Sequence, residues 1–204
     1  METLSHQAVL IGYSGHGFMC LDVAVLNKYS ILGFCDQVNK VFNPFNLKFL
    51  GSEIQLKNNT NVILGIGDNH IRFKIYKELP HLNYINIIHP SAVVASSVKL
   101  HNGIVIASSA VVNPFAKIGS GVIINTAAVI EHECVIGDFS HIAPGAVLCG
   151  NIKVGKRSFI GANSVIKQGV TIGDDVIIGA GSVVISNIPD NVTVVGNPSR
   201  ILKK

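Results

Sequence analysis

The sequence has no tryptophan and few charged residues. Aromatic residues make up 6% and charged residues 14% of its 204 residues, against about 25% charged residues in typical soluble domains. Lys and Arg exceed Asp and Glu by 16 to 12, a net charge of +4 that forms no dense basic run. This small excess, without interleaved aromatics, argues against nucleic-acid binding. Isoleucine and valine together number 52, so branched aliphatic side chains must fill the core, and the composition excludes a disordered chain.

Long hydrophobic runs are also missing, although the mean hydropathy is +0.45. Gly, Ser, Asn or a charge interrupts every apolar run before it reaches 18 residues, so no membrane insertion is expected. The segment 1–7 contains no Lys or Arg and leads directly into a strand-like segment, unlike a signal peptide. The cysteines Cys20, Cys35, Cys134 and Cys149 have no C-x-x-C spacing, which fits reduced thiols. We therefore expect a cytoplasmic protein.

Leucine is concentrated in the first part of the chain. Eleven of the 14 leucines precede residue 90, and the loss of this strong helix former predicts helices before that point and strands after it. Strand-like segments such as Ala8–Ile11 alternate there with helix-like segments such as Phe18–Lys28. The alternation predicts an α/β domain with a small parallel sheet over residues 1–88. A second domain is expected over residues 89–204.

The second domain repeats every six residues. Sixteen successive hexads each place Ile, Val or Leu at the same position. This period predicts a hexapeptide solenoid, a left-handed parallel β-helix, in which each hexad forms a short strand and a turn and three hexads close one coil. The sixteen hexads make about five coils, with the repeated aliphatic side chain pointing inward. The repeated residues are Val94, Leu100, Ile106, Val112, Ile118, Ile124, Ile130, Ile136, Ile142, Leu148, Val154, Ile160, Ile166, Ile172, Ile178 and Val184.

A glycine-rich loop, Gly12–Gly17, lies between an expected strand and an expected helix. Backbone N–H groups and a helix N-terminus bind phosphate in this setting. The order of its glycines differs from the G-x-G-x-x-G fingerprint, so the loop is weak evidence for NAD. Asp36 ends the next strand about twenty residues later, where a carboxylate can bind ribose hydroxyls. A tight turn that only packs is the alternative interpretation.

His132 lies off the inward row and is flanked by Glu131 and Glu133. An imidazole with a carboxylate at its second nitrogen suits a general base for an attacking amine, because the carboxylate raises its basicity and fixes its tautomer. From the residues alone, a solvated surface histidine explains the pattern equally well. Adjacent side chains diverge, so we choose Glu133 as the orienting carboxylate and keep Glu131 as the alternative.

Four segments together resemble one family. They are Gly12–Gly17, Asn125–Cys134, Ser140-His141 and Val195–Arg200, and the likeness covers essentially the whole chain. The family is that of bacterial sugar acetyltransferases that join a small Rossmann-like domain to a hexapeptide helix. It includes N-acetyltransferases of UDP-linked 4-amino-sugars, of the bacillosamine type, and sialic acid O-acetyltransferases. The hexads alone would indicate only an acyltransferase-like solenoid.

The resemblance implies roles for particular residues. It makes His132 the general base with Glu133 as its partner. Independently of the resemblance, no metal is expected, because a zinc site on such a solenoid needs three histidines, His132 and His141 supply only two, and His101 lies about two coils earlier. Acetyl-CoA contacts fall on His141, Gly150 and Ala162. A UDP-amino-sugar falls on Ser14, Gly15, His16, Asp36, Gln37 and Gly67, with Gln37 standing where the family often has an acidic residue.

The hypothesis is thus an acetyl-CoA-dependent N-acetyltransferase that acetylates the amino group of a UDP-linked 4-amino-sugar for bacterial glycan biosynthesis. One alternative is O-acetylation of a sialic-type sugar, and another is a non-catalytic sugar-nucleotide sensor. The intact segment Glu131–Glu133 disfavours the sensor, which need not keep it. His132 and His141 are both expected to point outward on a fold without a cleft of its own, which predicts a homotrimer with parallel helices and coenzyme sites between subunits.

Overall fold

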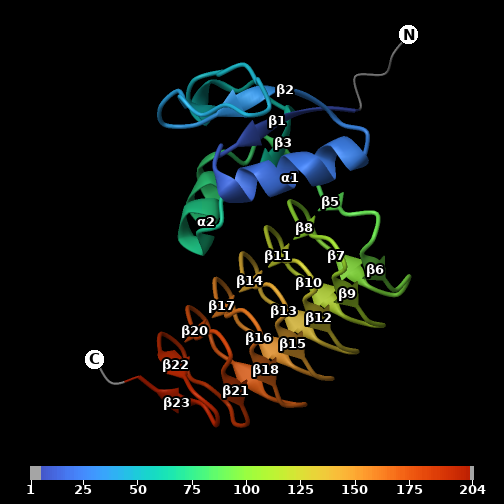
Figure 1. Cartoon of the computed structure of the whole chain (residues 1–204), viewed down its shortest axis with the longest axis vertical. Coiled ribbons are helices and arrows are strands. Elements are labelled where there is room, and N and C mark those ends of the chain that lie inside the picture. Colours follow the sequence, from blue (N-terminus) through green and yellow to red (C-terminus); the bar gives the residue numbers. More distant parts are fainter. Residues whose placement is uncertain (1–5, 203–204) are drawn as a thin grey trace.

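The computed structural model describes residues 6–202. An α/β domain lies at one end of a long solenoid (Figure 1). Residues 1–5, which belong to the segment interpreted as unlike a signal peptide, lie outside the described residues, as do residues 203–204. No helix in the described part of the chain is long and apolar enough to cross a membrane.

The first domain is Rossmann-like, with one parallel sheet in the order β2-β1-β3-β4. Its strands are β1 (Gln7–Ile11), β2 (Ser30–Cys35), β3 (Asn61–Leu64) and β4 (Asn83–Tyr84). Its helices are α1 (Gly15–Leu26) and α2 (Asn69–Glu78), with a 3-10 turn, η2 (Glu53–Gln55). Leu10 of β1 packs with α1, whereas its neighbour Val9 packs with α2. Because the sheet is covered on both faces, its central strand β1 is apolar and buried from Ala8 to Ile11.

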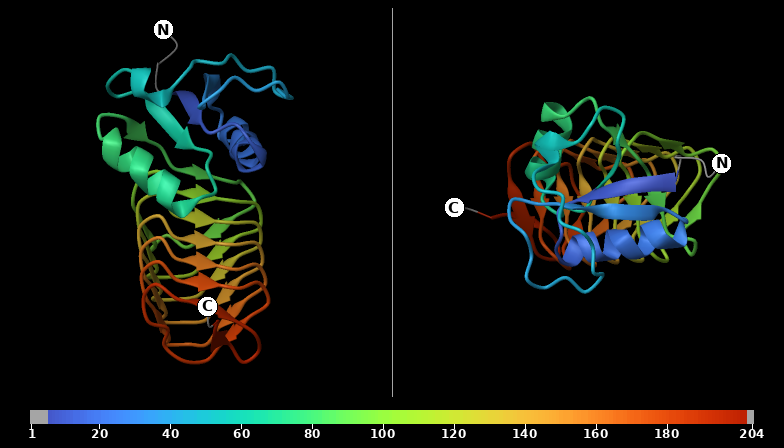
Figure 2. Two further views of the ribbon diagram at one scale, coloured as in Figure 1. Left: turned by 90° about the vertical axis from the view of Figure 1, so that its left-hand side faces the viewer. Right: turned by 90° about the horizontal axis from the view of Figure 1, so that it is seen from above.

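The second domain is a parallel β-solenoid with three flat faces (Figure 2). The domain face, on which the α/β domain sits, contains β5 (Ile87–Ile88), β8 (Val105–Ile106), β11 (Ile123–Ile124), β14 (His141–Ile142), β17 (Phe159–Ile160), β20 (Ile177–Ile178), β22 (Thr193–Val195) and β23 (Arg200–Ile201). The valine face contains β6 (Val93–Val94), β9 (Val111–Val112), β12 (Val129–Ile130), β15 (Val147–Leu148), β18 (Val165–Ile166) and β21 (Val183–Val184). The lysine face contains β7 (Lys99–Leu100), β10 (Lys117–Ile118), β13 (Val135–Ile136), β16 (Lys153–Val154) and β19 (Thr171–Ile172).

The repeated aliphatic residues line the interior, as the period predicts. Ile106, Ile124 and Ile142 lie above one another on the domain face in register and are fully buried. Ile88 before the sixteen hexads and Val194 after them continue the same stack. The solenoid is therefore longer than the hexads alone predict, and its pairing begins at Ile87, inside the segment expected to belong to the first domain.

The outward-pointing side chains, from the first residue of each two-residue strand, differ in chemistry between the three faces. The first residue of each valine-face strand is valine, six in succession, and these side chains are half-buried or exposed. The corresponding residues of the lysine face are exposed and mostly lysine. On the domain face, Ile87, Val105 and Ile123 are buried against α1. The valine face is thus the apolar side of the solenoid that no part of the described chain covers.

Candidate active site

The glycine-rich loop and Asp36 meet, as the sequence predicts. The Asp36 carboxylate accepts hydrogen bonds from the Tyr13 N–H at 3.0 Å and the Gln37 N–H at 2.8 Å, and it pairs with Lys40 at 3.1 Å. Gly17 is needed for this loop, because a Cβ there would lie 2.3 Å from the Gly12 carbonyl oxygen. Asp36 therefore ties the end of β2 to the loop that follows β1.

The other predicted nucleotide residues surround the same edge of the sheet. Ser14 and Gly15 are exposed at the start of α1, and the Ser14 side chain makes no capping hydrogen bond. The first N–H groups of a helix have no partner within it. Gly67, in the loop after β3, lies beside His16, whose Cβ is 3.9 Å from the position of a Cβ at Gly67. The carboxyl ends of three parallel strands thus form one crevice edge, the usual position of a nucleotide in this fold class.

His16 faces His141 across the contact between the two domains. Their ring centroids are 6.1 Å apart, and His16 Nε2 lies 3.6 Å from the Cys20 Sγ. Burial, followed by the positive charge of Arg72, lowers the pKa of His16 to about 4. His16 is therefore neutral at physiological pH.

His141 points outward from the solenoid, as its register predicts, but the α/β domain covers it and leaves it 7% exposed. The Asn125 amide donates to its Nε2 at 3.0 Å, so the ring carries its proton on Nδ1, which makes no well-formed hydrogen bond within the described chain and has only a weak interaction with the Gly67 backbone. Burial, then the charges of Arg72 and His16, lower the pKa of His141 to about 3, with a smaller opposing effect of the Gly67 backbone. Asn125 is a site neighbour to which the sequence analysis assigned no role.

His132 lies at a corner of the solenoid, between β12 of the valine face and β13 of the lysine face. Its Nδ1 is 3.1 Å from a carboxylate oxygen of Glu133, and the two side chains are 49% and 61% exposed. No hydrogen bond joins His132 to Glu131 within the described residues. The structure thus pairs the imidazole with Glu133, the carboxylate that we chose, and leaves Nε2 free of protein partners in the described chain.

Gly150 follows His132 by one coil at the same corner. A Cβ at Gly150 would lie 2.5 Å from Cε1 of the His132 ring. A side chain at this position would therefore displace the imidazole. Within residues 6–202, the Gly150 N–H donates to no protein acceptor.

Ala162 lies at a different corner, between β17 of the domain face and β18 of the valine face. Asn125 lies at the same corner, two residues after Ile123, which pairs with His141 of the next coil. Within one chain, His132 and Gly150 are therefore on one edge of the valine face and Ala162 and Asn125 are on the other, next to the domain face that the α/β domain covers.

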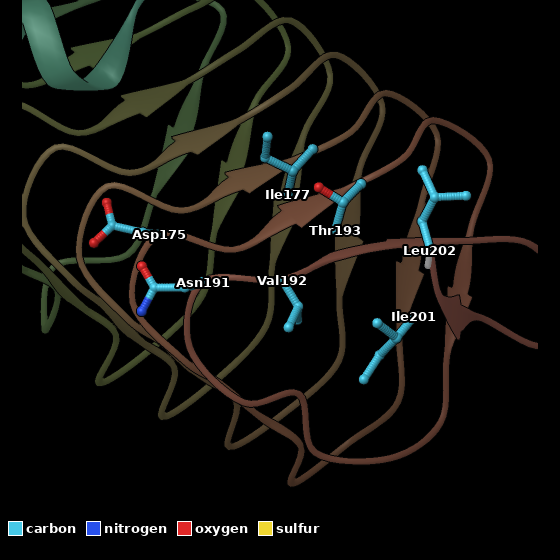
Figure 3. Close-up of a pocket in the computed structure, with 7 residues that line it drawn as sticks. All are labelled: Asp175, Ile177, Asn191, Val192, Thr193, Ile201 and Leu202. Atoms are coloured by element: carbon cyan, nitrogen blue, oxygen red, sulfur yellow. The ribbon is translucent and has the colours of Figure 1, made fainter. Parts of the chain in front are cut away.

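Two pockets lie on the domain face. One, of about 350 Å³, adjoins the loop after β3 and is lined by Gly67, Asp68, Asn69, His70, Arg157, Phe159, Asp175 and Ile177. The other, of about 650 Å³ at the C-terminal end, contains none of the predicted site residues (Figure 3). It is lined by Asp175, Ile177, Asn191, Val192, Thr193, Ile201 and Leu202. Among residues 6–202, no group of three His, Cys, Asp or Glu is arranged to hold a metal ion.

A Rossmann-like domain joined to a hexapeptide solenoid with a His–Glu pair at its corner defines a hexapeptide acyltransferase with an added α/β domain. Comparison with known families agrees. Residues 7–79 match the PglD N-terminal domain, residues 115–150 the bacterial transferase hexapeptide, and residues 151–186 the hexapeptide repeat of succinyl-transferase.

Solved structures extend the likeness to the whole chain. The acetyltransferase domain of PglB from Neisseria gonorrhoeae, also solved with acetyl coenzyme A, is 32% identical with a TM-score of 0.91 over 97% of this chain and 100% of that one. PerB from Caulobacter crescentus, solved with CoA and GDP-perosamine, is 32% identical with a TM-score of 0.90 over 97% of both chains. WeeI from Acinetobacter baumannii is 27% identical with a TM-score of 0.87 over 96% of this chain and 100% of that one. A comparison with curated protein sequences found no match.

The chain belongs to the family of sugar acetyltransferases that join a PglD-type N-terminal domain to hexapeptide repeats, and it is an enzyme of this family. The family and fold inferred from the sequence are confirmed. The roles of individual site residues stay predictions.

Proposed function

We propose that the protein transfers the acetyl group of acetyl-CoA to the amino group of a UDP-linked 4-amino-sugar, for bacterial glycan biosynthesis. The observation that carries this proposal is the His132–Glu133 pair, 3.1 Å apart at an exposed solenoid corner. The complexes of the related PglB domain with acetyl coenzyme A and of PerB with CoA and GDP-perosamine support both substrate classes. The cytoplasmic location stays a prediction.

His132 acts as the general base. As the amine nitrogen attacks the thioester carbonyl carbon, Nε2 of His132 takes its proton, and the CoA sulfur leaves with the bonding pair. Glu133 accepts the Nδ1–H, which holds the ring in the required tautomer and stabilises the imidazolium. The imidazolium proton then passes to the departing thiolate or to water, which restores the base.

Gly150 stabilises the charge that develops on the thioester oxygen. Its N–H has no protein acceptor in the described chain, and it lies directly beside the His132 ring. A preorganised backbone donor at such a position is worth several kcal/mol in transition-state stabilisation when water is excluded. Gly150 thereby has two roles: its N–H binds the thioester oxygen of the coenzyme, and its lack of a side chain leaves room for the His132 ring.

The sugar nucleotide binds at the crevice edge of the α/β domain, on the segments that hold Ser14, Gly15, His16, Asp36, Gln37 and Gly67. Exposed N–H groups at the start of α1 suit the diphosphate. Asp36 and Gln37 lie at the end of β2, where ribose or uracil edges are recognised. Because its pKa is lowered, His16 is neutral and binds the sugar nucleotide through hydrogen bonds, as donor or acceptor, and not through a positive charge.

The active site is shared between subunits of a homotrimer. His132 lies at the corner between the valine and lysine faces, whereas the α/β domain that carries the nucleotide crevice covers the domain face, so one chain does not bring them together. If three copies turn their valine faces toward a common axis, each His132 edge meets the neighbour's opposite edge. That arrangement joins His132 and Gly150 of one subunit to His141 and Ala162 of the next, with acetyl-CoA between them.

A thiol-release assay with acetyl-CoA and a panel of acceptors tests the proposal. The panel contains UDP- and GDP-linked 4-amino-sugars, CMP-sialic acid and free sialic acid, and mass spectrometry identifies the acetylated atom. We expect the UDP-linked amine to have the highest kcat/KM. Preference for the GDP-linked amine would overturn the nucleotide assignment, O-acetylated sialic acid would overturn the acceptor class, and sugar-nucleotide binding without thiol release would indicate a sensor.

A further inference from the structure

Arg72 is the largest fully buried side chain, with 1% exposure, and it lies on α2 between the two domains. Each of its three side-chain nitrogens donates hydrogen bonds to oxygen atoms. Nε donates to the Gly121 carbonyl at 3.1 Å, Nη1 to the carbonyls of Ile66 at 3.1 Å and Gly67 at 2.8 Å, and Nη2 to Asn69 Oδ1 at 2.8 Å and to the carbonyls of Phe139 at 2.9 Å and Ser140 at 3.5 Å.

These acceptors come from segments far apart in the chain. Ile66 and Gly67 form the loop after β3, which is part of the nucleotide crevice. Gly121 and Phe139 lie on successive coils at the corner between the lysine face and the domain face. The carbonyl of Ser140 directly precedes His141. One guanidinium thus joins the crevice loop to the coils that carry His141.

Stability alone does not explain a charge at this position. All of its hydrogen-bond acceptors are neutral, and burying a charge without a bonded counter-ion is costly. Burial lowers the pKa of Arg72 to about 9, against an opposing effect of the Asp68 carboxylate, which makes no hydrogen bond to the guanidinium in the described chain, and Arg72 stays charged at neutral pH. An apolar side chain packed against the solenoid would cost less, but it could not hold the loop carbonyls. After burial, the same charge is the next cause of the lowered pKa values of His16 and His141.

We propose that Arg72 is a positioning residue for the acceptor: it fixes the Ile66–Gly67 backbone against the solenoid, and so sets where the sugar of a bound sugar nucleotide is presented. Arg72 does not touch the reacting atoms in this arrangement. The inference rests on the proposed function, because it concerns the acceptor that this function names. Small displacements of a reacting group cost as much as 10²-fold in rate, so a rigid anchor under the crevice has a direct effect on turnover.

The chain offers a matched control in Asn27. Its side-chain amide donates to the Ile88 carbonyl at 2.8 Å and accepts from the Ile88 N–H at 3.0 Å. Asn27 also joins the α/β domain to the solenoid, but at the C-terminal end of α1 and without contact to the crevice loop. Loss of Asn27 therefore weakens the domain contact without releasing the loop.

The experiment compares the wild type with Arg72→Lys and Asn27→Ala, using two acceptors. One acceptor is the nucleotide-linked 4-amino-sugar, and the other is the free 4-amino-sugar, which does not use the crevice. For Arg72→Lys we expect kcat with the nucleotide-linked acceptor to fall about 10²-fold. We expect the rate with the free sugar, per folded trimer, and the KM for acetyl-CoA to change less than about threefold. Asn27→Ala should lower Tm and change neither acceptor's rate by more than about threefold.

Three results would overturn the inference: an equal loss with both acceptors, no loss with the nucleotide-linked acceptor, or the same selective loss in Asn27→Ala. If Arg72→Lys does not fold, Asn69→Ala replaces it. This change removes one acceptor of the guanidinium, together with the Asn69 amide's hydrogen bonds to the Arg157 and Ser158 carbonyls, and leaves Arg72 in place. It should give a selective loss of about tenfold, the effect of one hydrogen bond to a charged group.

If the wild type acetylates no nucleotide-linked acceptor, the proposed function fails. Calorimetry then tests the anchor alone, with whichever of UDP, GDP or dTDP the wild type binds most tightly. Arg72→Lys should weaken that binding about tenfold and Asn27→Ala should not. Unchanged binding in Arg72→Lys, or no binding of any of the three nucleotides by the wild type, would overturn the inference.

Discussion

The two histidine sites of the molecule differ in every physical respect. His132 is half-exposed and paired with a carboxylate at an open corner, whereas His16 and His141 are largely covered, lie beside a buried arginine and have pKa values lowered to about 4 and about 3. The imidazole of His132 has one nitrogen bonded to a carboxylate and the other without a protein partner in the described chain. A buried imidazole held neutral can only hydrogen-bond. The comparison separates a site suited to proton transfer from one suited to binding.

Replacing His132 by alanine gives the largest expected effect. We expect kcat to fall by about 10²- to 10⁴-fold, the usual contribution of a general base, with little change in the KM for acetyl-CoA. Steady-state kinetics at saturating acceptor measure this. His101→Ala, which removes another exposed histidine of the solenoid, should leave kcat unchanged. If His132→Ala keeps more than about a third of kcat, the amine attacks without this base.

Val147→Lys places a charge in the outward row of the valine face. We expect the trimer to dissociate and activity to fall about 10²-fold, because the two sites no longer meet. Val135→Lys is the matched control, since it makes the same change on the lysine face. Sedimentation velocity and thiol release on both variants measure assembly and activity. A trimeric and active Val147→Lys protein would show that the valine face is not the interface.

Stability should fall as the pH falls from about 6.5 toward 4. His16 and His141 are neutral in the folded protein over this range, whereas the unfolded chain takes up their protons below its ordinary pKa of 6.5. Each histidine therefore lowers the free energy of unfolding by about 1.4 kcal/mol for each unit by which the pH falls. Urea unfolding at several pH values measures the slope. His141→Gln should reduce it by about half, and His132→Ala should not change it.

The smallest effect is expected from the carboxylates beside His132. Glu133→Gln should lower kcat about three- to tenfold, because the amide oxygen can still accept the Nδ1–H but has lost the charge that makes this bond about twice as strong as a neutral one. Glu131→Gln should stay within about twofold, since no hydrogen bond joins Glu131 to the ring in the described chain. Equal losses in the two variants would mean that net charge, not ring orientation, supports the base.

The solenoid could be predicted from the sequence because its core depends on a local period. Each inward aliphatic residue is set by its position in the hexad, and its neighbours are one coil away in the same register. The choice between Glu131 and Glu133 could not be made that way. Glu133 has a φ of 61°, a turn conformation that recurs every six residues from Gly103 to Gly181. The position of Glu133 in this repeated left-handed turn was the sequence signal that distinguishes it from Glu131.

The contact between the domains could not be predicted from the sequence. The register shows that His141 points outward, but not that the α/β domain covers it and brings it to His16. Arg72 was missed because an arginine at helical spacing ordinarily faces solvent. Its burial depends on carbonyl groups from three separate segments, and a contact of this kind has no local sequence signal.

The core of the solenoid repeats every six residues, but its surface repeats every eighteen, as the register of Val105, Ile123 and His141 shows. A deletion of one hexad, such as residues 143–148, would leave every inward aliphatic residue in place. It would also rotate each later strand onto the next face, so that Lys153 would enter the row of valines. The solenoid can therefore keep the chemistry of its three faces only if whole coils of eighteen residues are inserted or deleted. Its length can change during evolution in steps of one coil.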